Sequence, residues 1–254
     1  MAAQNLNITA LQLDIKWNDA EFNRSRVEAL ISNSKNTDVF VLPEMFSTGF
    51  ITEPGNDCEG ENGETLEWMK RMAYATDAAL TGSVAIKTKV GDYRNRMYFV
   101  KPNGEYLYYD KHHLFTYGKE HLHYSAGEER VIVTWKNVRI LLQVCYDLRF
   151  PCFSRNKDVY DLCIYVASWP QSRRNVWDIL LRARAIENQC YVVGVNRIGD
   201  DINCHYNGGT TVISPYGKDL VTAKDDEVDI ITSSLDIEKL NQFREKFPVL
   251  RDAD

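Results

Sequence analysis

The stretch Val138-Arg-Ile-Leu-Leu-Gln-Val-Cys-Tyr-Asp-Leu-Arg-Phe-Pro151 contains an apolar run that ends on a cysteine. Such a run is typical of a strand buried in a sheet, and Cys145 follows it directly. Glu44 follows an earlier apolar run, and Lys111 follows a tyrosine-rich one. In α/β proteins, groups at strand ends meet in a crevice above the sheet. We therefore expect an acid, a cation and a thiol to come together.

Strand and helix patterns alternate along the chain on both sides of this stretch, and hairpin turns occur between some of the strands. Strands are predicted over residues 7–14, 39–42, 80–88, 94–101, 106–110, 138–144, 162–167, 191–195 and 210–214, with helices over 18–31, 63–77 and 175–189 and a last strand and short helix at 236–247. The mixture favours an α/β fold with mixed sheets. No low-complexity linker divides the chain, so residues 1–254 are predicted to form a single domain.

Composition excludes several classes of protein. The 254 residues are 44% hydrophobic and 26% charged, as in a soluble globular protein. The net charge of −6 and the lack of a long basic run disfavour nucleic-acid binding. No apolar run approaches the ~18 residues of a membrane span. The start, residues 1–7, lacks the regions of a signal peptide, so we expect a cytoplasmic protein whose six cysteines are mostly buried thiols.

Sequence motifs for cofactors and metals are missing or incomplete. GxGxxG, GxSxG, CxxC and HExxH do not occur. Gly55 to Gly60 has the glycine spacing of a phosphate-binding loop, but Glu61 stands where lysine is needed. His121 and His123 would share one face of a strand and form half of a metal site, yet nothing supplies the other ligands. We predict no metal and no cofactor.

Three strings around the candidate residues occur in order: Pro43-Glu-Met-Phe-Ser-Thr-Gly-Phe50, Tyr109-Asp-Lys-His-His-Leu-Phe115 and Val144-Cys-Tyr-Asp-Leu-Arg-Phe-Pro151. Together they resemble the nitrilase (carbon–nitrogen hydrolase) superfamily, whose signature is a Glu-Lys-Cys triad. The resemblance covers nearly the whole chain and is greatest to the bacterial omega-amidase branch, which hydrolyses 2-oxoglutaramate, 2-oxosuccinamate and similar keto-acid amides. Further matching stretches are Glu120–Gly127, Ala183–Gln189 with Asn196-Arg197, Ser168-Trp-Pro170 and Arg244–Pro248.

The resemblance implies a four-layer α-β-β-α sandwich with two pseudo-symmetric halves, and a homodimer or higher homo-oligomer. It implies that Cys145 is the nucleophile, Glu44 the general base, and Lys111 the cation that stabilises the tetrahedral intermediate. The backbone N–H of Tyr146 would be the second donor to the oxyanion. Glu120 matches a supporting glutamate that orients the triad and the substrate.

The implied chemistry suits these residue types. A free thiol has a pKa of about 8.5, so little of it is thiolate at pH 7. We expect Lys111 to favour the thiolate and lower the pKa of Cys145, while Glu44 holds the proton. The sulfur then attacks the amide carbon, ammonia leaves, and a thioester remains on Cys145. Glu44 activates the water that releases the acid.

A keto-acid amide carries a carboxylate at its far end, which arginine binds bidentately. Arg173 is the first candidate and Arg174 the second, although both can instead be solvated charges at the start of a helix. Arg149 can bind a substrate carboxylate or form a structural ion pair. Phe46 and Trp169 are predicted either as apolar walls of the substrate site or as core residues.

Each member of the triad also has a structural explanation. Cys145 can be a packed thiol, Glu44 a helix cap, and Lys111 a surface charge. The family strings favour catalysis over these alternatives. We expect Asp147 to orient backbone groups rather than act as an acid, and Glu187 to be paired with an arginine.

Three rival functions remain open. Another branch of the superfamily, such as a nitrilase, a carbamoylase or an aliphatic amidase, would share the triad. A papain-like Cys-His-Asn hydrolase would use His205 as its base, but the strings around Cys145 do not fit it. A non-catalytic scaffold would not need the complete triad.

Overall fold

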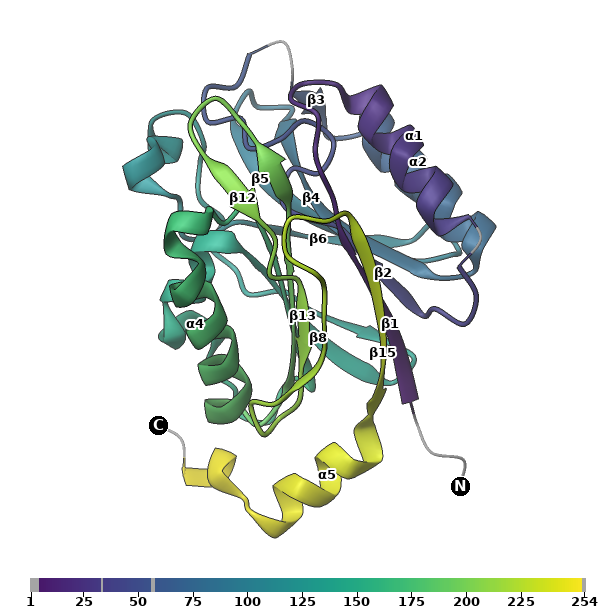
Figure 1. Cartoon of the computed structure of the whole chain (residues 1–254), viewed down its shortest axis with the longest axis vertical. Coiled ribbons are helices and arrows are strands. Elements are labelled where there is room, and N and C mark those ends of the chain that lie inside the picture. Colours follow the sequence, from purple (N-terminus) through teal and green to yellow (C-terminus); the bar gives the residue numbers. More distant parts are fainter. Residues whose placement is uncertain (1–4, 33, 56–57, 253–254) are drawn as a thin grey trace.

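Two mixed β-sheets lie face to face between layers of helices (Figure 1). The computed structural model describes residues 5–32, 34–55 and 58–252. Residues 1–4, at the start examined for a signal peptide, and residues 56–57, within the glycine-spaced stretch, lie outside the described residues. No helix in the described ranges has both the length and the hydropathy needed to cross a membrane.

The first sheet has the order β15-β1-β2-β4-β5-β6, and the short β3 pairs with β4. Its strands β1, β2 and β4 are parallel. β15 is antiparallel to β1, β5 is antiparallel to β4, and β6 is antiparallel to β5. The strands are β1 (Asn5–Gln12), β2 (Val39–Val41), β3 (Glu59–Gly60), β4 (Ala79–Lys87), β5 (Tyr93–Val100), β6 (Tyr106–Asp110) and β15 (Asp229–Asp236).

The second sheet has the order β14-β13-β10-β9-β8-β7 and repeats the plan of the first. Its central strands β8, β9 and β10 are parallel, and antiparallel strands flank them on both sides. A separate hairpin pairs β11 with β12. The strands are β7 (Ile132–Trp135), β8 (Val138–Val144), β9 (Leu162–Ala167), β10 (Tyr191–Asn196), β11 (Ile198–Asp200), β12 (His205–Asn207), β13 (Thr211–Ile213) and β14 (Asp219–Thr222).

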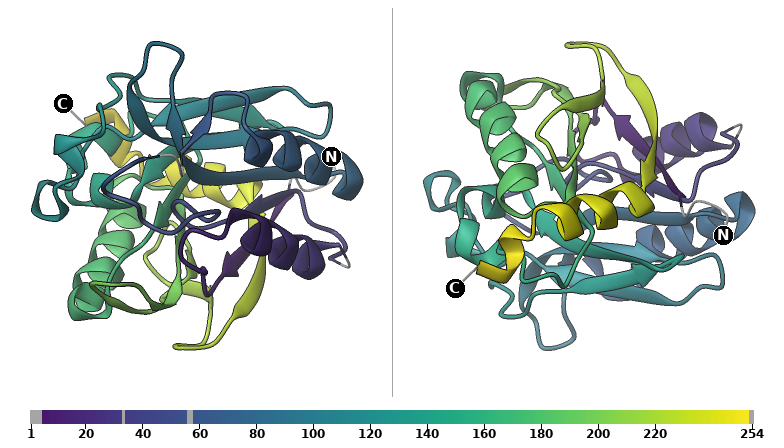
Figure 2. Two further views of the ribbon diagram at one scale, coloured as in Figure 1. Left: turned by 90° about the horizontal axis from the view of Figure 1, so that it is seen from above. Right: turned by 90° about the horizontal axis from the view of Figure 1, so that it is seen from below.

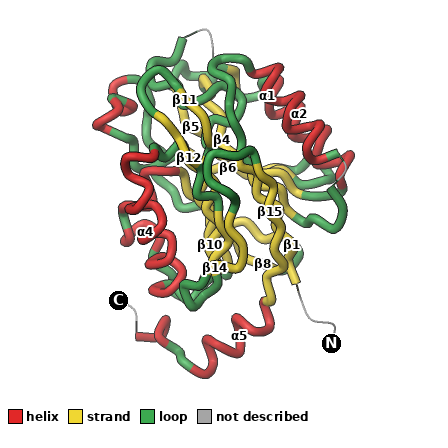
Figure 3. The backbone as a smooth tube through the Cα atoms, viewed as in Figure 1, coloured by secondary structure: helices red, strands yellow, loops and turns green. Residues whose placement is uncertain are grey.

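The longer helices lie on the outer faces of the sheets, while strands fill the middle of the molecule (Figures 2 and 3). Helices α1 and α2 cover the first sheet, α4 covers the second, and α5 crosses one end. This is the four-layer α-β-β-α sandwich that the resemblance implies. The helices are α1 (Ala20–Ile31), α2 (Glu64–Thr76), α3 (Pro151–Ser154), α4 (Arg174–Glu187) and α5 (Ile237–Lys246), with 3-10 turns at Thr116–Gly118, Glu120–Leu122, Cys145–Arg149, Gln171–Arg173 and Val249–Asp252.

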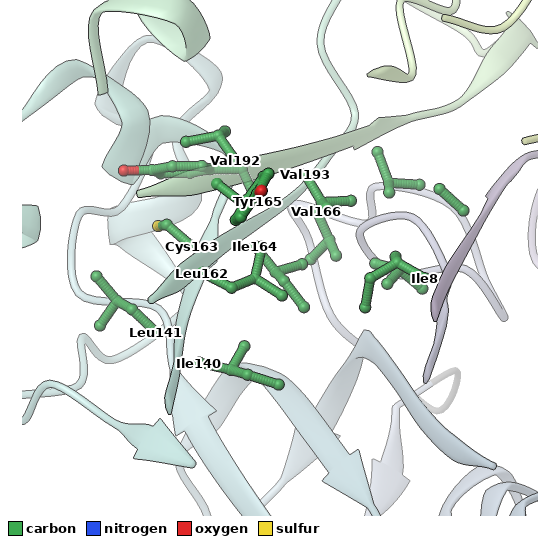
Figure 4. Close-up of a cluster of buried hydrophobic side chains, with 14 of the residues drawn as sticks. Ile8, Ile140, Leu141, Leu162, Cys163, Ile164, Tyr165, Val166, Val192 and Val193 are labelled. Atoms are coloured by element: carbon green, nitrogen blue, oxygen red, sulfur yellow. The ribbon is translucent and has the colours of Figure 1, made fainter. Parts of the chain in front are cut away.

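The side chains of β1 alternate between two cores. Ile8 of β1 faces the space between the sheets, where Ile140, Ile164 and Val166 of the second sheet meet it (Figure 4). Leu11, of opposite parity on β1, packs beneath α1 and α2 instead. Both faces of the first sheet are therefore buried, which explains the continuous apolar runs of its central strands.

The predicted elements agree closely with the observed ones, with identifiable exceptions. Asp19 caps α1 by accepting a hydrogen bond from the backbone N–H of Phe22 at 3.1 Å. A 3-10 turn covers Glu120–Leu122, so His121 and His123 do not share the strand face that the half metal site would need. The strands β3, β7, β11, β12 and β14 were not predicted.

Candidate active site

The ends of three strands bring the predicted catalytic residues together. Glu44 lies just beyond β2, Lys111 just beyond β6, and Cys145 just beyond β8. The two sheets meet at this edge, because the backbone N–H of Ser168, just beyond β9, donates to Glu44 Oε2 at 2.8 Å. The crevice expected from the strand ends is therefore formed by residues of both halves.

Lys111 is held between two carboxylates. Its Nζ donates to Glu44 Oε1 at 3.0 Å and to Glu120 Oε2 at 2.9 Å, with a further contact to Glu120 Oε1 at 3.2 Å. All three side chains are fully buried. Neither Glu44 nor Lys111 is therefore the helix cap or surface charge of the structural alternative.

Neutral donors complete the bonding of the two carboxylates. Asn95 on β5 donates from Nδ2 to Glu44 Oε1 at 2.8 Å and to Glu120 Oε1 at 3.2 Å. The backbone N–H of Phe115 donates to Glu120 Oε2 at 2.7 Å. Asn95 was not among the predicted site residues, because it stands between Arg94 and Arg96 at the polar start of β5 and its sequence context is not distinctive.

The loop after β6 fixes Lys111 from both sides of its backbone. The Lys111 N–H donates to the carbonyl of Asn95 at 2.9 Å, and the Lys111 carbonyl accepts from the N–H of Gly127 at 3.0 Å. A Cβ on Gly127 would lie 2.2 Å from the carbonyl oxygen of Asp110, so only glycine fits at this contact. The position of the ammonium is thus set by the sheet and its loop.

Cys145 lies at a sharp strand-to-helix turn. Its φ of 47° is in the left-handed region, which a non-glycine residue adopts only at a cost. The 3-10 turn begins at Cys145, so the N–H of Tyr146 precedes the first hydrogen bond within the turn and is available to an outside acceptor. This geometry suits the predicted role of that N–H as an oxyanion donor.

The electrostatics of Cys145 differ from the expectation. Burial is the main cause of a pKa well above the usual value, and the Glu44 carboxylate raises it further. Lys111 acts in the opposite direction but does not outweigh these two effects. The predicted lowering effect of Lys111 is present, but burial and Glu44 outweigh it, so the expected net fall in the pKa of Cys145 is not observed. The resting nucleophile is a neutral thiol that needs a base.

The two other ionisable groups respond to the same burial. Burial alone would lower the pKa of Lys111, but Glu120 and Glu44 raise it well above the usual value, so Lys111 is a permanent cation. Burial, together with the charge of Glu44, raises the pKa of Glu120 despite the opposing effect of Lys111. The site thus combines a fixed positive charge with a Glu120 carboxylate that binds a proton more readily than usual.

Asp147 braces the nucleophile turn, as predicted. Its Oδ2 accepts from the Val144 N–H at 3.0 Å and from the Tyr109 hydroxyl at 2.8 Å. Its Oδ1 accepts from the His113 N–H at 2.9 Å and lies 2.8 Å from His113 Nδ1. These contacts tie the Cys145 turn to the segment that carries Lys111.

A cavity of about 840 Å³ opens above this network. Ser168 and Phe50 line it, and both also touch the buried network: Ser168 bonds to Glu44, and the Lys111 Nζ lies 5.2 Å from the centroid of the Phe50 ring. Aromatic residues form much of its wall, namely Trp17, Phe115, Tyr117 and Tyr206. Ser168 and Phe50 thus link the cavity to the triad, whose own side chains are not among the lining residues.

The three candidate arginines differ in what they contact. Arg173 lines the cavity, with its guanidinium 5.4 Å from the Phe115 ring centroid. It makes no ion pair with any residue that the structure describes. Arg174 is paired with Asp178 at 2.9 Å and Asp225 at 2.8 Å, and it is not a lining residue.

The other predicted residues have structural environments. Arg149 lies 5.1 Å from the Trp169 ring centroid, and no ion pair joins it to a described residue. Trp169 is 3% exposed, and its Nε1 donates to the Arg173 carbonyl at 2.8 Å. Phe46 is fully buried beside Trp68 in the core beneath α2 and does not line the cavity. Of the alternatives for Phe46 and Trp169, the core position is observed for both.

Two further predictions concern residues outside the cavity. Glu187 accepts from Arg184 at 2.7 Å, which confirms the expected arginine pair. His205 is exposed. Its Nδ1 lies 2.9 Å from Asp200 Oδ1, and its Nε2 lies 3.1 Å from Asp226 Oδ1. The groups acting on Cys145 are Glu44, Lys111 and Ser168, which disfavours the papain-like alternative. No group of three His, Cys, Asp or Glu side chains suited to a metal occurs among the described residues.

Comparison with known proteins identifies the family. The carbon–nitrogen hydrolase family model matches residues 7–245. Omega-amidase YafV of Escherichia coli (strain K12) is 46% identical over 98% of this chain and 97% of its own length, and 2-oxoglutaramate amidase of Bacillus subtilis is 34% identical over 96% of each chain. The crystal structure of XC1258 from Xanthomonas campestris, a CN-hydrolase superfamily protein with an arsenic adduct in its active site, superposes with a TM-score of 0.95 at 41% identity, covering 98% of this chain and 97% of that one. The chain therefore belongs to the carbon–nitrogen hydrolase family and is a hydrolase of amide carbon–nitrogen bonds.

Proposed function

We propose that this protein is an omega-amidase that hydrolyses keto-acid amides such as 2-oxoglutaramate to the dicarboxylic keto acid and ammonia. The observation that carries this proposal is the buried Glu44–Lys111–Glu120 network beside Cys145. The cavity above it is lined by Arg173, which forms no ion pair with a described residue. The names of the Escherichia coli and Bacillus subtilis relatives support the same substrate class.

The first half of the reaction forms a thioester. As Sγ of Cys145 attacks the amide carbon, Glu44 takes the thiol proton. The negative charge on the former carbonyl oxygen is stabilised by Lys111 Nζ and the N–H of Tyr146. Glu44 then gives the proton to the amide nitrogen, the carbon–nitrogen bond breaks, and ammonia leaves. The acyl group remains bound to Cys145.

The second half returns the enzyme to its starting state. Water attacks the thioester carbon while Glu44 takes one of its protons, and the same two donors stabilise the oxyanion. The carbon–sulfur bond breaks, the acid leaves, and the proton on Glu44 returns to the sulfur of Cys145. Because the thiol starts neutral, Glu44 is needed in both halves.

We assign the far carboxylate of the substrate to Arg173. A charge-assisted hydrogen bond contributes about 1.5–3 kcal/mol, so Arg173→Ala should raise KM for 2-oxoglutaramate roughly 10- to 100-fold. A neutral amide without that carboxylate should be affected little. Arg174→Ala is the matched control, because the neighbouring arginine is already paired with two aspartates. Equal effects of Arg173→Ala on both substrates would rule out this assignment.

The substrate claim is tested by ammonia release from a panel of compounds. We expect rapid release from 2-oxoglutaramate and little from glutamine, a simple nitrile or a carbamoyl amino acid. Activity on another member of the panel would retain the mechanism and replace the substrate.

We further propose that residues 1–254 form one domain, that the chain is a homodimer or higher homo-oligomer, and that it works in the cytoplasm. The core shared by both sheets supports the first proposal. Ile179 and Ile186, 56% and 55% exposed on the outer helix α4, support association through outer helices. The free thiols of Cys145, Cys152, Cys163, Cys190 and Cys204 fit a reducing compartment. Light scattering tests the oligomer: a monomer would contradict it.

A further inference from the structure

Asn95 occupies a place in the buried network that no catalytic role yet explains. Its Nδ2 donates to Glu44 at 2.8 Å and to Glu120 at 3.2 Å, and the residue is 1% exposed. Among the described residues, Asn95 supplies the one neutral group that bonds to both carboxylates, since Ser168 reaches Glu44 alone and Phe115 reaches Glu120 alone. Asn95 is therefore the neutral bridge between the base and its supporting glutamate.

The orientation of the Asn95 amide follows from its partners. A flipped amide would place its oxygen against two carboxylate oxygens and lose both hydrogen bonds. In the observed orientation Oδ1 is buried with no hydrogen-bond partner among the described residues. An unpaired buried acceptor such as Oδ1 costs free energy. The two hydrogen bonds from Nδ2 to the carboxylates offset that cost.

Asn95 also fixes the cation through its backbone. The Asn95 carbonyl accepts from the Lys111 N–H at 2.9 Å. The residue lies inside β5, paired with Ala85 of β4, so its backbone is held by the sheet rather than by a loop. One rigid residue thus contacts Glu44, Glu120 and Lys111, all three charged members of the network.

We propose that Asn95 is a positioning residue that holds Glu44 and Glu120 in place and keeps Glu44 ionised to accept the proton of Cys145. Two buried carboxylates that share one cation repel each other, and hydrogen bonds donated to the charged forms oppose that repulsion. Without Asn95, the pair would hold a proton more readily, and Glu44 would be less available as a base. This inference rests on the role of Glu44 in the proposed function.

The test compares Asn95→Leu, which has similar size without polar groups, with Asn95→Ser, which keeps one hydroxyl donor. Met97→Leu is the control, because Met97 lies two residues along the same strand and faces the core between the sheets. Ammonia release gives kcat and KM across pH. Alkylation of Cys145 by iodoacetamide, followed by peptide mass spectrometry, reports proton removal from the thiol without any substrate.

We expect Asn95→Leu to lower kcat roughly 10- to 100-fold, with KM changed less than about threefold. The acidic limb of both the kcat and the alkylation profiles should move up by about one pH unit. The kcat and the pH profiles of Asn95→Ser should lie between those of Asn95→Leu and wild type. The kcat and the profiles of Met97→Leu should match those of wild type.

A folded Asn95→Leu enzyme with unshifted profiles would overturn the proposal. If Asn95→Leu does not fold, Asn95→Ser provides the test: the acidic limb of its kcat and alkylation profiles should move up by a smaller amount, and unshifted profiles would overturn the proposal. The two proposals fail in different ways. If the wild type releases no ammonia from the panel, the substrate proposal fails, while the alkylation profiles still test Asn95.

Discussion

Replacing Lys111 by methionine removes the one cation from a fully buried network. Lys111 Nζ lies 3.0 Å from Glu44 Oε1 and 2.9 Å from Glu120 Oε2, and none of these side chains is exposed. Breaking a buried ion pair by deleting one partner costs about 3–5 kcal/mol, because an uncompensated charge remains. We expect Lys111→Met to lose stability of this size at pH 7.5.

The loss should depend on pH in a direction that the structure fixes. Burial already raises the pKa of Glu120 above its usual value, and removing Lys111 removes the main opposing charge. A carboxyl with a raised folded-state pKa stabilises the fold below its unfolded pKa, and this contribution is lost as the pH rises through the folded value. The lysine of the wild type stays charged in both states below about pH 10. The variant's deficit should therefore shrink by roughly 1–3 kcal/mol between pH 7.5 and 5.5.

Urea unfolding of wild type, Lys111→Met and Lys111→Met/Glu120→Gln at both pH values measures this effect. The double variant carries one buried carboxylate fewer, so it should be more stable than Lys111→Met at pH 7.5 and less dependent on pH. A deficit that is the same at both pH values, or a double variant less stable than the single one, would refute the electrostatic account of this network.

Three further predictions concern residues around the site and at the surface. Asp147→Asn should cost about 1–3 kcal/mol and lower kcat, because an amide N–H₂ would face groups that already donate; unchanged urea unfolding and kcat would contradict this. Asp19→Ala should lower the urea midpoint by removing the α1 cap, and a midpoint equal to that of wild type would show that the cap contributes nothing. His205 should titrate above its usual value of about 6.5, because its hydrogen bonds to Asp200 and Asp226 raise its pKa, so its contribution to stability is present at low pH and lost as the pH rises; a midpoint at or below 6.5 in an NMR titration would exclude it.

Much of the fold could be predicted because local signals agree with the packing. Residues 162–167 form an unbroken apolar run, and the observed β9 has the same bounds. Residues 63 and 77 bracket α2 as its caps. In contrast, β7 is a short edge strand that enters a hairpin through Lys136 and Asn137, both at positive φ. The Lys-Asn pair is not one of the glycine-containing sequences typical of two-residue hairpin turns, and a four-residue strand is too short for a distinctive alternation of polar and apolar residues.

The chemistry of the site was less predictable than its members. Glu44, Lys111 and Cys145 follow strand ends and could be identified from the surrounding strings. The direction of the Cys145 pKa shift could not be predicted from the sequence, because it depends on how deeply the thiol and Glu44 are buried together. The donors from Ser168 and Phe115 are backbone N–H groups, which every residue type except proline provides. Only the fold shows which of them point at a carboxylate.

Ammonia release from 2-oxoglutaramate by wild type and Cys145→Ala tests the central claim most directly, with Cys152→Ala as the control for an exposed cysteine. The account predicts fast release by wild type and Cys152→Ala, and none above background by Cys145→Ala. Release by Cys145→Ala at the wild-type rate would contradict a thioester on Cys145 and the mechanism built on it.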